Sequence, residues 1–309
     1  MLTNTQMRHA RRNTSTLLLL LLLSASSASA AMAQGQATAS PAQTTTAQTT
    51  VPSAQTTAQP GSDGIALAPA RVELEMQPGS ETTVVVNLDY RALNDAAQPA
   101  RIVASLNDWN ITREGQVEFY RAGTQANSAS PWLIYSPAET TVEPGKTHSI
   151  RVTVTVPKEA AAGDHLAALI VEQRPDSIKF NSQSRRQMVV RYRMACVFYI
   201  KVPQLTRRGS LENLQAAADA DGVTVVPTLK NGGNSVLRPV SSAKVVDAAG
   251  RTVAELPEGE SLPVLGGAEL SQKLRIDKQL APGAYSVRYR IDFQDGSRTT
   301  EGVTDLVVK

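Results

Sequence analysis

Few residues in this chain could carry nucleophilic or metal chemistry. The only cysteine is Cys196, and outside the first 33 residues the only histidines are His148 and His165. A zinc site normally takes three or four His, Cys or carboxylate ligands. Cys196 lies in an apolar alternating stretch, where an unassisted cysteine behaves as a small hydrophobe. No HExxH, CxxC, GxSxG, P-loop or GxGxxG motif occurs. We therefore expect a protein that is not an enzyme, with no catalytic residues, metal ligands or cofactors.

The charge balance argues against a nucleic-acid partner. Lys and Arg number 31, of which three lie in the first 33 residues, and those residues hold no acidic side chain. The remainder therefore has 28 basic residues against 28 acidic ones. A chain this close to neutral lacks the electrostatic footprint of a nucleic-acid-binding protein. No constellation of residues indicates a small-molecule substrate either.

Residues 1–33 have the pattern of a secretory signal peptide. Basic Arg8, Arg11 and Arg12 precede an apolar run from Leu17 to Leu23, and small residues follow, with cleavage after either Ala30 or Ala33. The apolar run is far shorter than the roughly 20 residues that cross a bilayer, and no later segment is apolar enough to span one. The pattern predicts a periplasmic protein with no integral membrane span in the mature chain; release from the cell is the alternative.

Residues 34–62 differ sharply in composition from the rest of the chain. They are rich in Thr, Gln and Ala, carry almost no bulky side chain, and repeat the tetrad Ala-Gln-Thr-Thr at 42–45, 47–50 and 54–57. Such a segment cannot bury enough apolar surface to offset its ordering entropy. We interpret it as a disordered low-complexity linker.

From Ile65 onward the sequence alternates short runs rich in Val, Ile and Tyr with clusters of Gly, Pro and Asn, which is typical of strands and turns. The pattern predicts an all-β fold with two immunoglobulin-like β-sandwich domains, at 63–203 and 204–309. Strands are expected in the first domain near 65–76, 82–90, 100–109, 116–120, 132–135, 148–156, 165–173 and 187–202. Strands are expected in the second near 223–229, 242–247, 252–256, 269–277, 284–293 and 298–308.

Individual strands predict which side chains face a core. In Ser149–Val156 the residues Ile150, Val152, Val154 and Val156 share one face, as in a sheet with one buried and one solvated side. Trp109 is expected to be the buried tryptophan of an immunoglobulin-like sandwich.

The stretch from Met188 to Lys201 is the most informative part of the pattern. At 14 residues it is long for a strand. Its even-numbered face, from Met188 to Ile200, is apolar throughout. One interpretation is an edge strand that offers part of this face to a partner strand. The other is a long last strand that connects the two domains.

The chain resembles the periplasmic pilus-assembly chaperones, the PapD-like family, over residues 65–203 and more loosely over 204–309. Three stretches carry the resemblance. They are Ala68-Pro69-Ala70-Arg71-Val72; Pro131-Trp132-Leu133-Ile134-Tyr135-Ser136-Pro137 with Val142-Glu143-Pro144-Gly145-Lys146 and Ile150-Arg151-Val152; and the long alternating stretch Gln187–Pro203.

The resemblance implies two immunoglobulin-like domains and a long strand that completes the fold of an exported pilus or fimbrial subunit by donor-strand addition, a mode of recognition known for such chaperones. It also implies that an arginine on the first strand and a lysine on the donor strand hold the subunit's terminal carboxylate. Arg71 matches the arginine. The lysine position falls on Cys196 or Phe198, or on the basic pair Arg191 and Arg193, depending on the alignment. The resulting candidate partner-binding residues are Arg71, Val190, Arg191, Tyr192, Arg193, Met194 and Cys196.

Two features depart from the family pattern. The turn from Val156-Pro157 to Gly163-Asp164-His165 also resembles generic bacterial immunoglobulin-like surface domains, and the Thr/Gln-rich linker is unusual for a fimbrial chaperone. The alternative function is therefore a structural or adhesion-associated module of the cell envelope that binds other surface proteins. Both functions require an exported pilin-like or envelope protein as partner.

Overall fold

The computed structural model describes residues 64–91, 98–174 and 192–309. The predicted signal peptide and linker lie outside this part of the chain. Within it there are 18 strands and a single three-residue 3₁₀ turn, Ser130–Trp132, which cannot span a membrane. The strands form four sheets arranged as two β-sandwiches, so the predicted all-β fold with two sandwiches is confirmed.

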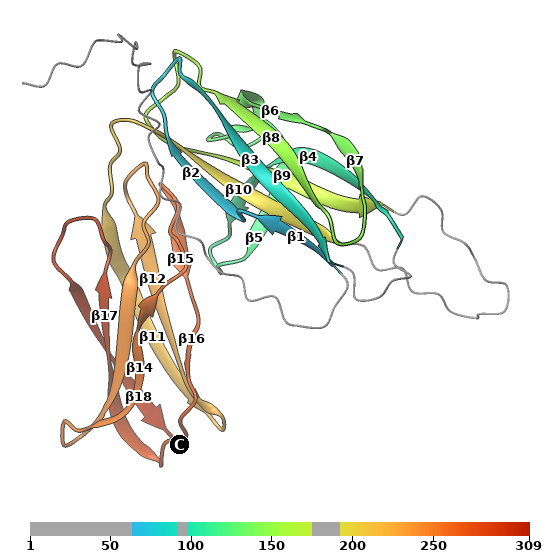
Figure 1. The fold of residues 1–309 in the computed structure, drawn as a ribbon. Helices are drawn as coiled ribbons and strands as arrows, with labels where there is room; N and C mark the ends of the chain where they lie inside the picture. The colour runs from blue at the N-terminus through green and yellow to red at the C-terminus, as the bar shows by residue number, and fades with distance from the viewer. Residues whose placement is uncertain (1–63, 92–97, 175–191) are drawn as a thin grey trace, which may run out of the picture. The chain divides into compact units, whose positions relative to one another are not determined.

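The first sandwich contains the strands from β1 to β10. One sheet has the order β1-β3-β8-β6, and the other has the order β2-β10-β9-β4-β5 with β7 also pairing with β4 (Figure 1). The strands are β1 (Gly64–Ala68), β2 (Arg71–Glu75), β3 (Glu81–Arg91), β4 (Ala100–Ile111), β5 (Val117–Arg121), β6 (Leu133–Ser136), β7 (Glu139–Val142), β8 (Thr147–Thr155), β9 (Gly163–Arg174) and β10 (Arg193–Val202).

The predicted first strand is divided between the two sheets. β1 pairs antiparallel with β3 in one sheet, whereas β2 pairs parallel with β10 in the other, and Pro69 and Ala70 connect them. Because β2 begins only at Arg71, it covers β10 from Val197 onward and leaves the earlier part of β10 without it.

The core of the first sandwich confirms the alternation expected for β8. Ile150, Val152, Val154 and Val156 are all buried between the sheets. Trp109 is buried as predicted, but on the outer side of the β2-β10-β9-β4-β5 sheet, where its ring meets Tyr199 edge to face with centroids 5.1 Å apart.

The second sandwich contains the strands from β11 to β18. One sheet has the order β11-β12-β15 with β16 also pairing with β12, and the other has the order β14-β13-β17-β18. The strands are β11 (Gly209–Asp219), β12 (Gly222–Asn231), β13 (Val240–Asp247), β14 (Thr252–Glu260), β15 (Glu269–Ser271), β16 (Leu274–Ile276), β17 (Gly283–Asp292) and β18 (Thr300–Val308). Their buried side chains, among them Val225, Val245, Val287 and Tyr289, form a separate core.

A third apolar cluster joins residues of the two sandwiches. Trp109, Leu166, Ile170 and Tyr199 come from the first, and Val236 and Leu265 come from the segments around β12 to β15 of the second. Beside this cluster, Gly163 has φ +124°, and a side chain added there would approach the carbonyl oxygen of Asn234 to 2.9 Å. The close approach of the two segments therefore requires glycine at this position.

Candidate functional site: a strand edge and a basic cluster

Strand β10 uses its two faces for different cores. The even-numbered side chains Cys196, Phe198 and Ile200 are fully buried in the core of the first sandwich, and Met194 packs against the same core. The odd-numbered Val197 and Tyr199 face the cluster that joins the two sandwiches. The apolar face that the sequence suggested for a partner strand is therefore filled from Met194 onward by the chain's own core, whereas Tyr192 on the same face is exposed.

The edge of β10, in contrast to its faces, is partly open. Alternate residues of a strand direct their N–H and C=O groups to opposite sides. Residues with even numbers bond toward β9, as when Gln173 N–H donates to the Tyr192 carbonyl at 2.9 Å. Those with odd numbers bond toward β2: Val197 N–H donates to the Ala70 carbonyl at 3.0 Å.

Since β2 does not extend past Ala70 along β10, the main-chain groups of Arg193 and Ala195 face a side where no described strand pairs with them. An open row of N–H and C=O groups at a sheet edge is a template for another strand. Its length here is short, and it ends abruptly where β2 begins.

A basic cluster lies at that point, on the outer face of the sheet. The carboxylate of Glu73 forms ion pairs with three cationic side chains. It accepts hydrogen bonds from Arg238 Nη2 at 2.6 Å on Oε1 and from Lys201 Nζ at 2.7 Å on Oε2, and Arg71 Nε lies 3.1 Å from Oε1. Arg71 and Glu73 alternate along β2, Lys201 ends β10, and Arg238 follows β12 in the second sandwich. We call these four residues the basic cluster.

The electrostatics of the cluster favour the ionised carboxylate. Burial disfavours the charged form of Glu73, but the hydrogen bond from Lys201 and the charges of Arg238, Lys201 and Arg71 outweigh it and lower its pKa. Arg238 also lies over the ring of Tyr199, 5.3 Å from its centroid, which is a cation–π geometry. The cluster is thus fixed from several sides.

The candidate residues from the sequence divide clearly in the structure. Arg71 is in the basic cluster, where its side chain is 37% exposed. Tyr192 and Arg193 are exposed at the start of β10. Val190 and Arg191 lie outside the described residues. Cys196 is a core residue whose burial raises its pKa to about 12, which makes it an inert small hydrophobe with no surface to offer a partner.

Arg193 does not assist Arg71 as expected. Its backbone is in register with Glu172 of β9, and it lies four residues before Val197, the residue that is in register with Arg71. Four residues of strand correspond to about 13 Å. Lys201 supplies the second cation, and Arg238 the third. Lys201 is the last polar residue on the odd-numbered face of β10, and this position could have indicated it as the lysine of the cluster. Nothing in the sequence links Arg238 to Glu73.

Another carboxylate lies near Lys201. Asp164 is in register with Lys201 across β9 and β10, is buried, and accepts from Val236 N–H at 2.7 Å and Ser235 Oγ at 3.3 Å through Oδ2. Its Oδ1 has no hydrogen-bond partner among the described residues. Burial raises the pKa of Asp164 despite these bonds, which lower it.

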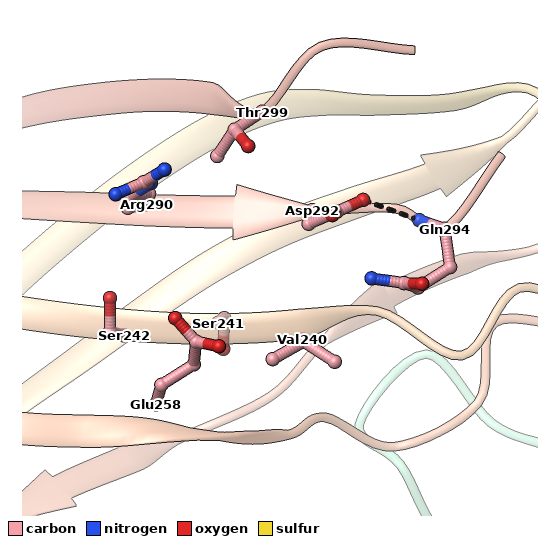
Figure 2. A pocket seen from close by; sticks show the side chains of 8 residues that line it. All are labelled: Val240, Ser241, Ser242, Glu258, Arg290, Asp292, Gln294 and Thr299. Atoms are coloured by element: carbon pink, nitrogen blue, oxygen red, sulfur yellow. Dashed lines mark hydrogen bonds between the residues drawn. The ribbon is translucent and has the colours of Figure 1, made fainter. Parts of the chain in front are cut away.

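A small polar pocket lies on the β14-β13-β17 sheet of the second sandwich (Figure 2). It is lined by Glu258, Arg290, Asp292 and Gln294 among others, and Asp292 accepts from the Gln294 N–H at 2.8 Å. Over the described ranges, no group of three or more His, Cys, Asp or Glu side chains has the arrangement of a metal site. The pocket thus offers no chemistry comparable to the open strand edge and the basic cluster.

No family model matches the sequence, and no curated protein matches it either. Solved structures similar to this chain include the Pseudomonas aeruginosa CupB2 chaperone, at 15% identity and a TM-score of 0.37 over 79% of this chain and 100% of the other. The Salmonella enterica SafA pilin in complex with the SafB chaperone matches at 12% identity and a TM-score of 0.38, over 79% and 98% of the two chains. The class 5 fimbriae chaperone CfaA matches at 11% identity and a TM-score of 0.39, over 80% and 100%.

Proposed function

We propose that this protein is a periplasmic chaperone-like protein that binds an exported pilin-like or envelope subunit by adding a strand of that subunit to the open edge of β10. The observation that carries the proposal is the position of β2, which pairs from Val197 onward and leaves the main-chain groups of Arg193 and Ala195 without a strand partner on that side among the described residues. Main-chain hydrogen bonds supply the affinity in this mode of recognition. The family resemblance of residues 65–203 agrees with it.

The charge of the basic cluster selects the direction of the added strand. A strand that follows β10 toward Val197 must stop at Ala70, where β2 takes over the edge, and its end then lies beside Arg71. In the parallel direction this end is a C-terminal carboxylate, which pairs favourably with a guanidinium. In the antiparallel direction it is an ammonium group, which the cations of the cluster repel. Parallel addition with the carboxyl terminus at Arg71 is therefore the arrangement that we propose.

The side chains of β10 contribute little to this capture, because most of them are already used. Met194 and Cys196 face the chain's own core, so the partner gains main-chain pairing and a charge contact, with Tyr192 and Arg193 as the exposed neighbours. A chaperone that relies on these contacts tolerates variation in the sequence of the captured strand.

The test compares two substitutions at one position. Ala195→Pro removes the N–H that faces the open edge and leaves the ladder to β9 unbroken, since proline is tolerated where the N–H faces solvent. Ala195→Ser keeps the N–H and serves as the matched control. Mature wild-type protein and both variants, produced in the native host, are used to isolate bound exported subunits. We expect the serine variant to retain them and the proline variant to lose them.

Equal recovery with both variants contradicts strand addition. Recovery of surface proteins alone, unaffected by either substitution, would favour the structural or adhesion-associated module in its place.

A further inference from the structure

Glu73 occupies the basic cluster with the same chemical group that a partner's terminus would bring. Both of its carboxylate oxygens are in use, Oε1 by Arg71 and Arg238 and Oε2 by Lys201. Arg71 Nε lies 3.1 Å from Oε1 as an ion pair with no hydrogen bond among the described residues, unlike Arg238 and Lys201. Guanidinium groups bind carboxylates best through two parallel N–H donors, so the contact with Arg71 uses only part of what that side chain can offer.

The charges of the cluster do not balance. Three cations surround the carboxylate of Glu73. Of the neighbouring acids, Asp164 directs its Oδ2 to Val236 and Ser235, and Glu75, in register with Lys201, is exposed and makes no ion pair among the described residues. The two arginines are the accessible members: the side chain of Arg71 is 37% exposed and that of Arg238 is 29% exposed, against 11% for Lys201. A second carboxylate would approach from the arginine side.

We propose that Glu73 is an internal competitor for this site: its carboxylate holds the cations in the free protein and yields Arg71, and with it Arg238, to an incoming carboxylate. The identity of that carboxylate as the C-terminus of a captured strand rests on the proposed function, whereas the competition itself does not. Glu73 thereby sets a threshold for binding, because a ligand must replace an existing ion pair and not merely fill an empty site.

The opposite role for Glu73 makes the opposite prediction. If Glu73 only positions Arg71 and Arg238 for the ligand, its removal weakens binding of a carboxylate. If it competes with the ligand, its removal strengthens that binding. Glu73→Gln separates these roles, because the amide keeps the size and one acceptor oxygen of the side chain while it removes the negative charge.

The probe is a short peptide, acetyl-Thr-Val-Thr-Val, with a free C-terminal carboxylate, and its matched control is the same peptide with a C-terminal amide. Binding to the mature wild-type chain and to Glu73→Gln is followed by NMR of the arginine Nε–H groups, with Arg71 assigned by its loss in Arg71→Ala. We expect the free-acid peptide to bind Glu73→Gln about tenfold more tightly than wild type, a change of the order of one displaced ion pair. The amide peptide should not distinguish the two proteins.

Equal or weaker binding of the free acid to Glu73→Gln overturns the competition. Should that variant fail to fold, Glu73→Asp, which shortens the side chain by one methylene, gives the same comparison with the same expected sign. The two proposals fail separately. If Glu73→Gln binds the acid more tightly but the protein captures no subunits, only the proposed chaperone function is contradicted. If capture depends on Ala195 but Glu73→Gln does not bind the free-acid peptide more tightly, only the proposal that Glu73 competes is contradicted.

Discussion

Lys201 Nζ lies 2.7 Å from Glu73 Oε2, and this contact joins the last residues of β10 to the strand that ends its open edge. The lysine side chain is nearly buried, so removing either partner would leave an uncompensated buried charge and cost more than breaking an ion pair on the surface. It fixes Glu73 among three cations and keeps its pKa low.

Replacing Lys201 should raise the pKa of Glu73. The wild-type carboxylate contributes stability that is present above its ordinary pKa of 4.5 and is lost as the pH falls through its lowered value. In Lys201→Met the hydrogen bond and one charge disappear while burial remains, so this loss moves to higher pH. NMR titration of the glutamate carboxyl carbon measures the change. Lys230→Met, which removes a half-exposed lysine 3.6 Å from Glu269, is the control and should leave Glu73 unaffected.

Asp164 should produce the opposite dependence on pH. Because its folded pKa is raised, its contribution to stability is present below the ordinary value of 3.8 and is lost as the pH rises through the folded value. Asp164→Asn does not titrate. The free energy of unfolding of wild type relative to this variant should therefore fall as the pH rises from about 3 to about 7. Urea denaturation at several pH values measures the difference, and a constant difference would argue against a buried ionised carboxylate at this position.

Phe198 should be the residue of β10 on which the first sandwich depends most. Its side chain is fully buried, and Phe198→Ala should lower the free energy of unfolding by about 3–5 kcal/mol through lost burial and a cavity. Tyr192→Ala, at the exposed start of the same segment, should change it by less than about 0.5 kcal/mol. Similar losses in both variants would contradict the burial of Phe198 in the core and the exposure of Tyr192 at the start of the segment.

Met194→Glu should destabilise the protein as well as any complex. Met194 packs against the core of its own sandwich, and a charged side chain there is costly. A loss of capture in this variant would therefore not identify a binding residue. At Ala195, whose side chain packs against the cluster around Trp109 and Tyr199, the serine control reports the effect of changing the side chain, and only the proline variant also removes the edge N–H. Thermal unfolding of Met194→Glu beside Ala195→Ser checks this expectation, and an unchanged midpoint for Met194→Glu would contradict it.

The alternation of apolar residues was sufficient to predict most strands and the core face of β8, because burial on one side of a sheet imposes a period of two. It was not sufficient for β11, whose sequence Gly209–Asp219 has three Ala among mostly polar residues and lacks the β-branched residues that mark a strand. This strand forms by pairing along β12, which no local pattern reveals.

The candidate site was only partly predictable for a similar reason. Arg71 was selected because it matches the arginine that the family resemblance implies, but the partners of Glu73 depend on register and on contact between the two sandwiches. Lys201 lies 128 residues from Glu73 and Arg238 lies 165 residues from it. The apolar face of β10 was correctly recognised, but a pattern of alternation cannot tell whether the chain's own core or a partner fills that face. Only the start of β2 at Arg71 showed that the open part of β10 is its edge and not its apolar face.

Amide hydrogen exchange in the complex with a captured subunit is the decisive test of strand addition at β10. Binding should slow exchange at the N–H groups of Arg193 and Ala195, which face the open edge. The N–H of Met194, which bonds toward β9 in the free protein, should remain unchanged. A complex that forms with no added protection at Arg193 and Ala195 would contradict strand addition at β10.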